Sequence, residues 1–233
     1  GLGDVYKRQG IVEDLRRVSE YVKDLYPDLP LYLIAHSMGT LVTRVYLKKY
    51  DYIPSGVFLC GAPSSDNSTG VITPVLDKYA KLRGDHYKDQ LINDLFVGIF
   101  DFVFKDENQK SAWICSDKNV VDEFVNDPLC GFPLTVQGYI DLGTLLYAIN
   151  TDQWYRRVPK DLPILLISGE NDPVGDMGKG VRRTADAFRK AGLSDVTLKL
   201  YPGLRHEILN EGPMRQTVYE DIWHWLEPHL PAR

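Results

Sequence analysis

Residues 31–40 read Leu-Tyr-Leu-Ile-Ala-His-Ser-Met-Gly-Thr, a run that changes from strand-like to helical at its serine. Its first half, Leu31 to Ala35, is a short apolar stretch after a Pro-Asp-Leu-Pro turn, which predicts a buried strand. A helical pattern follows at once, from Met38 to about Lys49. Ser37 therefore lies at a sharp strand-to-helix turn, where a serine hydroxyl is raised above the end of a sheet.

The neighbours of Ser37 suit such a turn, which is so tight that the residues two before and two after the serine must be small. Ala35 and Gly39 meet this demand, although Ala stands where the G-x-S-x-G pattern has Gly. The N-terminus of the following helix favours negative charge, and the backbone N–H of Met38 is placed to donate to an oxyanion. The alternative is a serine that only caps a helix, but the buried strand before it favours a nucleophile.

Strands and helices alternate on both sides of this turn. Alternation of this kind predicts an α/β fold, with a mostly parallel sheet, helices on both faces and right-handed crossovers. The predicted elements are an amphipathic helix through Ile11, Leu15, Val18, Val22 and Leu25, strands at Gly56–Cys60, Ile164–Ser168 and Val196–Tyr201, and helices at about Gly180–Ala191 and Met214–Leu226.

The alternation is lost between residues 64 and 155. This region has polar loops, several helical stretches and 13 of the chain's 26 aromatic residues, the total being 14 Tyr, 8 Phe and 4 Trp. It is predicted to be an inserted, aromatic-rich helical subdomain, so the α/β core consists of residues 10–63 and 156–233.

A serine hydroxyl becomes a strong nucleophile only when a base takes its proton and an acid orients that base. In folds with this turn the order along the chain is serine, acid, histidine, each at the carboxyl end of a strand. Asp172 follows the strand Ile164–Ser168, and His206 follows the strand Val196–Tyr201. The sequence therefore predicts a triad of Ser37, Asp172 and His206.

Several residues compete for the two partner roles. Glu170 and Asp176 are the alternative acids in the loop of Asp172. His36 adjoins the nucleophile but is expected to point away from it and to pack beside the site. Surface or interhelical positions are expected for the remaining histidines. Solvated loop positions are expected for the charges that flank His206, the alternative being hydrogen bonds near the site. These residues are His86, His224, His229, Arg205 and Glu207.

Composition narrows the functional classes. The 233 residues carry a net charge of -5, with 27 Lys plus Arg against 32 Asp plus Glu, and 44% are hydrophobic. A chain of this size buries roughly 70% of its unfolded surface, so it needs no structural metal or disulfide. The acidic balance argues against nucleic acid as the main partner. The longest apolar run, Leu95 to Phe104, is well short of the roughly 18 residues typical of a membrane span.

The cysteines and the N-terminus bear on the origin of the chain. Cys60, Cys115 and Cys130 lack C-x-x-C spacing, which predicts buried free thiols and a reducing, cytoplasmic location. Residues 4–9, Asp-Val-Tyr-Lys-Arg-Gln, resemble a translated sequencing adapter found in metagenomic reading frames. Residues 1–9 are therefore predicted to be a non-native tail on a truncated bacterial protein, the alternative being a native polar tail.

Three stretches carry a family resemblance: LIAHSMGT, ISGENDPVGDMGKGV and YPGLRHEILNE. They resemble the nucleophile, acid and histidine regions of the monoacylglycerol lipase and lysophospholipase branch of the α/β-hydrolase superfamily, often labelled serine aminopeptidase S33. The resemblance covers residues 10–230. It implies a cofactor-free serine esterase, with Ser37 as nucleophile, His206 as base and then acid, and Asp172 orienting His206. It also implies that residues 64–155 form a helical cap over an acyl pocket.

The chain departs from that family at its N-terminus. Family members have several strands before the first helix, and a His-Gly loop among them donates the second oxyanion N–H. No such loop precedes Gly10. Loss of an oxyanion donor costs on the order of 100 to 1,000-fold in rate. We therefore expect an inactive or insoluble fragment in which the strand Leu31 to Ala35 is an exposed hydrophobic edge.

The expected substrate is a lipid-like ester, a monoacylglycerol or a lysophospholipid, with transient membrane-surface contact through the cap and no obligate protein partner. Two alternatives stay open. The same triad serves thioesterases, acyltransferases and peptidases. A non-catalytic member of the fold would only bind a hydrophobic ligand or a partner protein.

Overall fold

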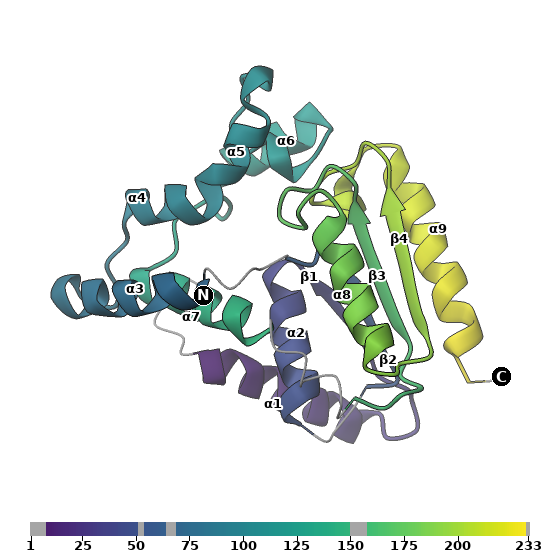
Figure 1. Ribbon diagram of the computed structural model, residues 1–233. Coiled ribbons are helices and arrows are strands. Elements are labelled where there is room, and N and C mark those ends of the chain that lie inside the picture. Colours follow the sequence, from purple (N-terminus) through teal and green to yellow (C-terminus); the bar gives the residue numbers. More distant parts are fainter. Residues whose placement is uncertain (1–7, 51–53, 64–68, 150–157, 232–233) are drawn as a thin grey trace.

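The computed structural model describes residues 8–50, 54–63, 69–149 and 158–231 (Figure 1). Its centre is a sheet of four parallel strands in the order β1-β2-β3-β4. The predicted α/β architecture is confirmed, because helices connect each parallel strand to the next. The strands are β1 (Tyr32–His36), β2 (Gly56–Cys60), β3 (Ile164–Gly169) and β4 (Val196–Tyr201).

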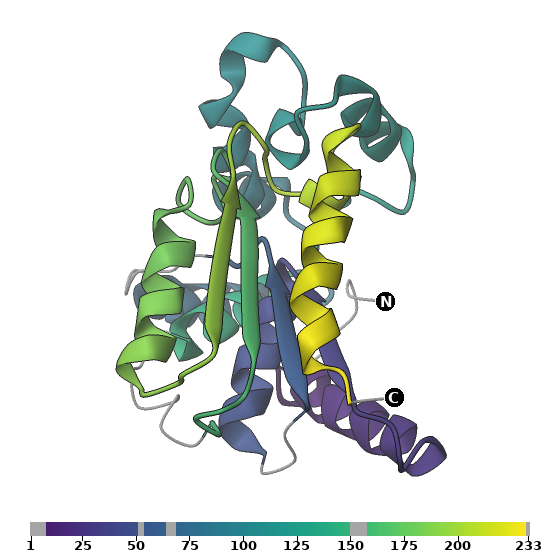
Figure 2. The same cartoon turned by 90° about the vertical axis from the view of Figure 1, so that its right-hand side faces the viewer.

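Helices cover both faces of the sheet (Figures 1 and 2). Alternate residues of β2 divide between two core clusters: Val57 and Leu59 pack with one set of helices, Phe58 and Cys60 with the other. Successive side chains of a strand point to opposite faces, so both faces are buried. The first face is covered by α1 (Arg8–Leu25), α2 (Met38–Lys49), α7 (Val136–Ala148) and α8 (Lys179–Lys190), and the second by α9 (Met214–Leu226).

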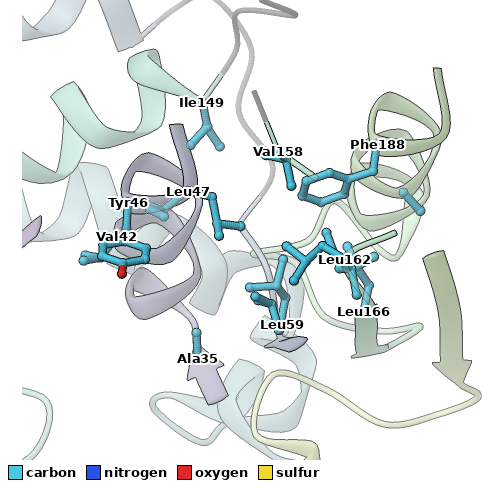
Figure 3. Close-up of a cluster of buried hydrophobic side chains, with 14 of the residues drawn as sticks. Ala35, Val42, Tyr46, Leu47, Leu59, Ile149, Val158, Leu162, Leu166 and Phe188 are labelled. Carbon is cyan, nitrogen blue, oxygen red and sulfur yellow. The ribbon is translucent and has the colours of Figure 1, made fainter. Parts of the chain in front are cut away.

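The larger core cluster lies between the sheet and the first set of helices. Figure 3 shows its side chains converging from four elements: Leu59 of β2, Leu166 of β3, Leu47 of α2 and Phe188 of α8. All four side chains are fully buried. This packing fixes the strands whose carboxyl ends carry the predicted site residues.

The segment between β2 and α7 is helical, and Figure 2 shows most of it beyond the arrowheads of the strands. It has small cores of its own, one of which joins Leu76 and Ala80 to Tyr139 and Ile140 of α7. The predicted boundary at residue 155 lies outside the described residues. The elements are α3 (Thr69–Arg83), α4 (Gln90–Asn93), a π-helical turn (Asp94–Gly98), α5 (Ile99–Val103), 3-10 turns at Lys105–Glu107 and Ala112–Ile114, and α6 (Lys118–Asn126).

The N-terminal helix starts earlier than its apolar pattern predicts. Helix α1 begins at Arg8, three residues before Ile11, the first residue of the apolar pattern, because helix hydrogen bonding does not require an apolar side chain. Most of the predicted foreign tail, residues 1–7, lies outside the described residues. The other predicted elements are confirmed to within one residue at their ends.

Strand β1 lies at an edge of the sheet. Within the described residues it pairs only with β2, and its Ile34 side chain is 71% exposed. The predicted hydrophobic edge is therefore confirmed. Among the residues that the structure describes, no helix combines the length and the apolar character that crossing a bilayer requires.

Candidate active site

Ser37 occupies a strained turn between β1 and α2. Its φ of 51° and ψ of -122° are unfavourable for a residue with a side chain. The turn is held from both sides, since the Ser37 N–H donates to the Cys60 carbonyl at 3.0 Å and the Thr40 N–H donates to the Ser37 carbonyl at 2.9 Å. A Cβ atom on Gly39 would lie 3.9 Å from the Cβ of Ala35. A methyl group at position 39 would therefore make an ordinary van der Waals contact with Ala35 across the turn.

Met38 is the first residue of α2, immediately after Ser37. The first four N–H groups of a helix have no partner within the helix. The N–H of Met38 is one of them, which agrees with the oxyanion role predicted for it. Among the described residues, no group of three His, Cys, Asp or Glu side chains is arranged to hold a metal ion.

Asp172 and His206 form a buried pair at the carboxyl ends of β3 and β4. The distance from His206 Nδ1 to Asp172 Oδ2 is 2.9 Å, and the side chains are 4% and 0% exposed. Asp172 also accepts from the Ser168 hydroxyl at 3.2 Å and from the Val174 N–H at 2.9 Å. A buried carboxylate without such donors would be costly. These contacts fix the Asp172 side chain toward His206.

Two glycines allow the loops of the site to approach one another. A Cβ atom on Gly61, the residue after β2, would lie 3.1 Å from Nδ1 of His206. A Cβ atom on Gly169 would lie 2.1 Å from the Leu204 carbonyl oxygen, in the loop that carries His206. The Ser37 N–H is hydrogen-bonded to the Cys60 carbonyl, and His206 lies against Gly61, the next residue. The end of β2 therefore lies between Ser37 and His206 and contacts both.

Within the described residues, no hydrogen bond joins the Ser37 hydroxyl to Nε2 of His206. Bonds of this kind are often long before substrate is bound. The structure therefore brings Asp172 and His206 into direct contact. It places Ser37 at the same carboxyl end of the sheet, on β1, two strands away from β3.

The alternative acids bind other partners. Glu170 pairs with Arg182 at 3.7 Å, and Asp176 pairs with Arg183 at 2.8 Å. Both arginines belong to α8, and all four side chains are at least 43% exposed. Neither carboxylate is a hydrogen-bond partner of His206.

The other histidines lie where the sequence suggested, with one addition. His36 packs beside the site, and its ring centroid is 4.8 Å from that of His206. Burial, and to a smaller extent His206, lower the pKa of His36. His86 and His224 are exposed, whereas His229 is half-buried and bonded to Asp195.

Arg205 is not a solvated loop charge, so that prediction is wrong. Its side chain is 9% exposed and donates to the Glu107 carboxylate and to the carbonyl oxygens of Ala112, at 2.6 Å, and Cys115. The reason is that residues 107–115, nearly a hundred positions earlier in the chain, cover it. The neighbouring Glu207 is only half-buried.

Two residues of the site were missed by sequence reasoning. The ring centroid of Trp113 lies 5.2 Å from that of His206. Glu211 is 2% exposed and accepts from the N–H groups of Arg205, at 2.8 Å, and Ser116, at 3.1 Å. No local signal marks either residue, because Glu211 follows Glu207 and Asn210 in an equally polar loop.

Cys60 lies under the site as a buried, free thiol. Burial raises its pKa, and the nearby Asp172 and Glu207 raise it further. A thiol in this environment stays protonated and unreactive. Cys60 is therefore not a second nucleophile at physiological pH.

A nucleophile-type turn, a buried acid and histidine on later parallel strands, and helices on both faces define the α/β-hydrolase class. A family model described as Serine aminopeptidase, S33 (Hydrolase_4) matches residues 2–213, and the chain belongs to this family.

Relatives with names agree with that class. A monoacylglycerol lipase from Mycolicibacterium smegmatis is 29% identical over 219 residues, covering 94% of this chain and 70% of the lipase. A monoglyceride lipase from Saccharomyces cerevisiae is 27% identical, covering 86% of this chain and 61% of that enzyme. The crystal structure of a thermostable carboxyl esterase from Bacillus coagulans, in complex with glycerol, superposes with a TM-score of 0.86 at 30% identity.

That superposition covers 95% of this chain and 72% of the esterase. The chain thus spans 61% to 72% of the length of these three proteins. By these relationships it is a carboxylic ester hydrolase of the α/β-hydrolase fold.

Proposed function

We propose that the protein hydrolyses esters of lipid-like substrates, a monoacylglycerol or a lysophospholipid, through an acyl-enzyme on Ser37. The observation that carries this proposal is the buried Asp172–His206 pair, 2.9 Å apart, at the sheet edge that bears the strained Ser37 turn. The substrate class is supported by the names of the mycobacterial and yeast relatives.

The proposed reaction assigns one role to each residue. The His206 Nδ1–H donates to Asp172, which leaves Nε2 free to take the Ser37 proton as the hydroxyl oxygen attacks the ester carbonyl. The Met38 N–H stabilises the oxyanion of the tetrahedral intermediate. His206 then gives the proton to the leaving alcohol. Attack by water, activated by the same nitrogen, releases the fatty acid and restores Ser37.

We propose that the helices between β2 and α7 act as a cap over the acyl chain. Residues 107–117 contact the loop of His206, and the Trp113 ring packs on the imidazole. An indole ring at this position offers apolar surface to a substrate bound at Ser37.

We also propose that the cap contacts lipid surfaces. Leu91, Leu95, Ile99 and Phe102 follow one another at steps of 4, 4 and 3, and each is at least 56% exposed. These four residues form one apolar face on α4, the π-helical turn and α5, and such a face binds at a membrane interface. Lys105 lies 4.8 Å from the Phe102 ring centroid, where its ammonium can reach lipid headgroups.

Sedimentation with phosphatidylcholine vesicles tests this lipid contact. We expect the wild-type chain to sediment with the vesicles and the double variant Leu91→Ser/Phe102→Ser to remain in solution. Val125→Ser on α6 is a matched control, because Val125 is also exposed but lies outside the face. Equal sedimentation of all three proteins would contradict the proposal.

The catalytic proposal is tested with p-nitrophenyl and monoacylglycerol esters. Because the chain is shorter than its relatives, the assay compares it with a chimera that adds the N-terminal segment of the mycobacterial lipase. We expect turnover to be lost in Ser37→Ala and kept in Ser55→Ala, which changes an exposed serine before β2. Turnover by Ser37→Ala equal to that of the unsubstituted chimera would exclude the proposal.

Other acyl substrates are the second candidate. The family description names an aminopeptidase, so peptides belong in the substrate panel beside thioesters and acyl acceptors. A fluorophosphonate probe separates catalysis of any kind from simple ligand binding, because it labels only an activated serine. We propose a cytoplasmic location without an obligate partner, supported by three free cysteines.

A further inference from the structure

Two buried charges lie six positions apart in the loop after β4, and both bind the same distant segment. Arg205 and Glu211 lie on either side of His206 in the chain, and their exposed fractions are 9% and 2%. Their partners belong to residues 104–117, here called the bracing segment. Buried charges are retained only where they are paired and hydrogen-bonded. The burial of two charged side chains so close to His206 therefore needs an explanation.

Arg205 binds the first part of the bracing segment. Its guanidinium pairs with Glu107, donates to the carbonyl oxygens of Ala112 and Cys115, and lies 4.0 Å from the ring centroid of Phe104. A planar guanidinium with several fixed donors can hold a loop in one geometry, whereas an ammonium cannot.

Glu211 binds the second part and also binds the histidine loop itself. Its carboxylate accepts from the N–H and the hydroxyl of Ser116, and from the N–H of Arg205. One backbone hydrogen bond and one thiol contact lie between these anchors: the Glu207 N–H donates to the Ile114 carbonyl at 2.7 Å, and the Cys115 thiol donates to the Asn210 carbonyl at 3.8 Å. The two anchors therefore fix the histidine loop to the bracing segment over its whole length.

The bracing segment in turn carries Trp113, whose ring packs on the His206 imidazole at 5.2 Å. We propose that Arg205 and Glu211 are positioning residues that couple docking of the bracing segment to the orientation of His206. The imidazole is held for proton transfer only while the segment is docked. This inference rests on the proposed function, and it assigns control of the base to the helices between β2 and α7.

The test uses Glu211→Gln and Arg205→Lys in the full 233-residue chain. Glu211→Gln keeps the size of the side chain but places an amide where donors converge. Arg205→Lys keeps the charge but loses the fork. Matched controls are Glu220→Gln and Arg189→Lys, which make the same changes at exposed positions of α9 and α8.

Two readouts separate positioning from stability. In the chain or in the chimera, whichever has turnover, we expect both substitutions to lower kcat on the order of 100-fold and to change KM little. A small misplacement of a catalytic group has an effect of this size. Independently of activity, we expect the far-downfield proton signal of the His206–Asp172 hydrogen bond to broaden or disappear in both variants, in folded protein well below the melting temperature.

The outcomes are distinguishable. A wild-type chain or chimera with no more turnover than Ser37→Ala refutes the proposed function, while the proton signal still tests the positioning role. An unchanged proton signal in both variants would overturn the inference. A rise in KM alone, or a loss of kcat that matches the fraction unfolded, would also overturn it, since either result assigns the residues to substrate binding or stability.

Discussion

The molecule contains two His–Asp pairs with the same spacing in the sequence and nearly the same hydrogen-bond distance. His206–Asp172 and His229–Asp195 are each 34 residues apart, with N···O distances of 2.9 and 2.8 Å. The first pair lies at the carboxyl ends of the strands. The second lies at the opposite end, where Asp195 precedes β4 and His229 follows α9.

Their environments differ in three respects. The side chains of the first pair are 4% and 0% exposed, and those of the second are 18% and 40% exposed. His206 uses Nδ1 toward its aspartate, and Nε2 has no hydrogen-bond partner in the described part of the chain. His229 uses Nε2 toward Asp195, and its Nδ1 is bonded to the Trp225 carbonyl at 2.6 Å. With both nitrogens hydrogen-bonded, the second imidazole has no nitrogen left to face a third group.

The comparison shows that a His–Asp pair is not a site by itself. The two pairs differ because His206 has a free Nε2, and because it lies at the carboxyl end of the sheet, where Ser37 also lies. The remaining pair has a structural role: His229 also accepts, through its backbone carbonyl, a bond from the Tyr32 hydroxyl of β1. It fastens the C-terminal turn to the sheet.

Removing one carboxylate from each pair should give the largest contrast. We expect Asp172→Asn to lower kcat on the order of 10,000-fold, because the wrong imidazole tautomer is then favoured. Asp195→Asn should leave kcat within about twofold, since its histidine has no catalytic nitrogen to orient. Steady-state kinetics on a short-chain ester in the chimera measures both. Comparable losses in the two variants would abolish the distinction.

Crowding the first pair should affect stability next. A methyl group on Gly169 would meet the Leu204 and Arg205 carbonyl oxygens at 2.1 and 2.3 Å, so the histidine loop must shift. We expect Gly169→Ala to lower the free energy of unfolding by about 1 to 3 kcal/mol, or more. Urea denaturation measures this change.

Gly203→Ala is the control for that experiment. It lies in the same loop with a φ of 77°, but nothing lies within 4 Å of its added methyl group. We expect it to cost about 1 kcal/mol from backbone strain alone. If Gly169→Ala were no worse than Gly203→Ala, close loop contact would not hold the first pair in place.

The first pair also has a neighbour that should make stability depend on pH. Burial is the main cause of the lowered pKa of His36, whose ring lies tilted against that of His206. Because the folded pKa lies below the unfolded value near 6.5, the unfolded state takes up the proton first. The contribution of His36 is therefore complete above about pH 6.5 and is lost as pH falls toward the lowered value, with a limiting slope of about 1.4 kcal/mol per pH unit.

His36→Gln should flatten this dependence between pH 5 and 7, as followed by urea denaturation at a series of pH values. His224→Gln, at an exposed position of α9, should leave it unchanged. An identical pH dependence in wild type and His36→Gln would show that His36 has the same pKa in both states.

The second pair should give the smallest effect. We expect His229→Ala to lower the free energy of unfolding by about 1 kcal/mol, the usual value of a partly exposed hydrogen bond, without a change in kcat. Urea denaturation of wild type, His229→Ala and Asp195→Asn measures the change in the free energy of unfolding. A loss of activity in His229→Ala in fully folded protein would mean that the two ends of the sheet are coupled.

The strands, and the loops that carry Ser37, Asp172 and His206, could be predicted because buried parallel strands are short apolar runs with turn residues after them. The acid could not be chosen with certainty from the sequence. Glu170 and Asp176 stand in the same loop, and only the fold turns them toward Arg182 and Arg183 of α8.

Arg205 and Glu211 lay beyond sequence reasoning for a different reason. A charged residue in a loop is usually solvated, and burial of these two depends on residues 104–117, about a hundred positions away. No local pattern encodes that contact. For the same reason no sequence pattern distinguishes His229, with its partner Asp195, from an ordinary surface histidine.

Helix α7 has a consequence for recombining this protein with its relatives. Its first half packs with the helices after β2, through Val136 and Tyr139, while Leu145, near its end, belongs to the core of the sheet. If the recombination point is placed after α7, the exchanged helices bring with them a foreign piece of the sheet core. Chimeras joined just before residue 136 keep the core intact, so the transferable module is smaller than the stretch between the two strands.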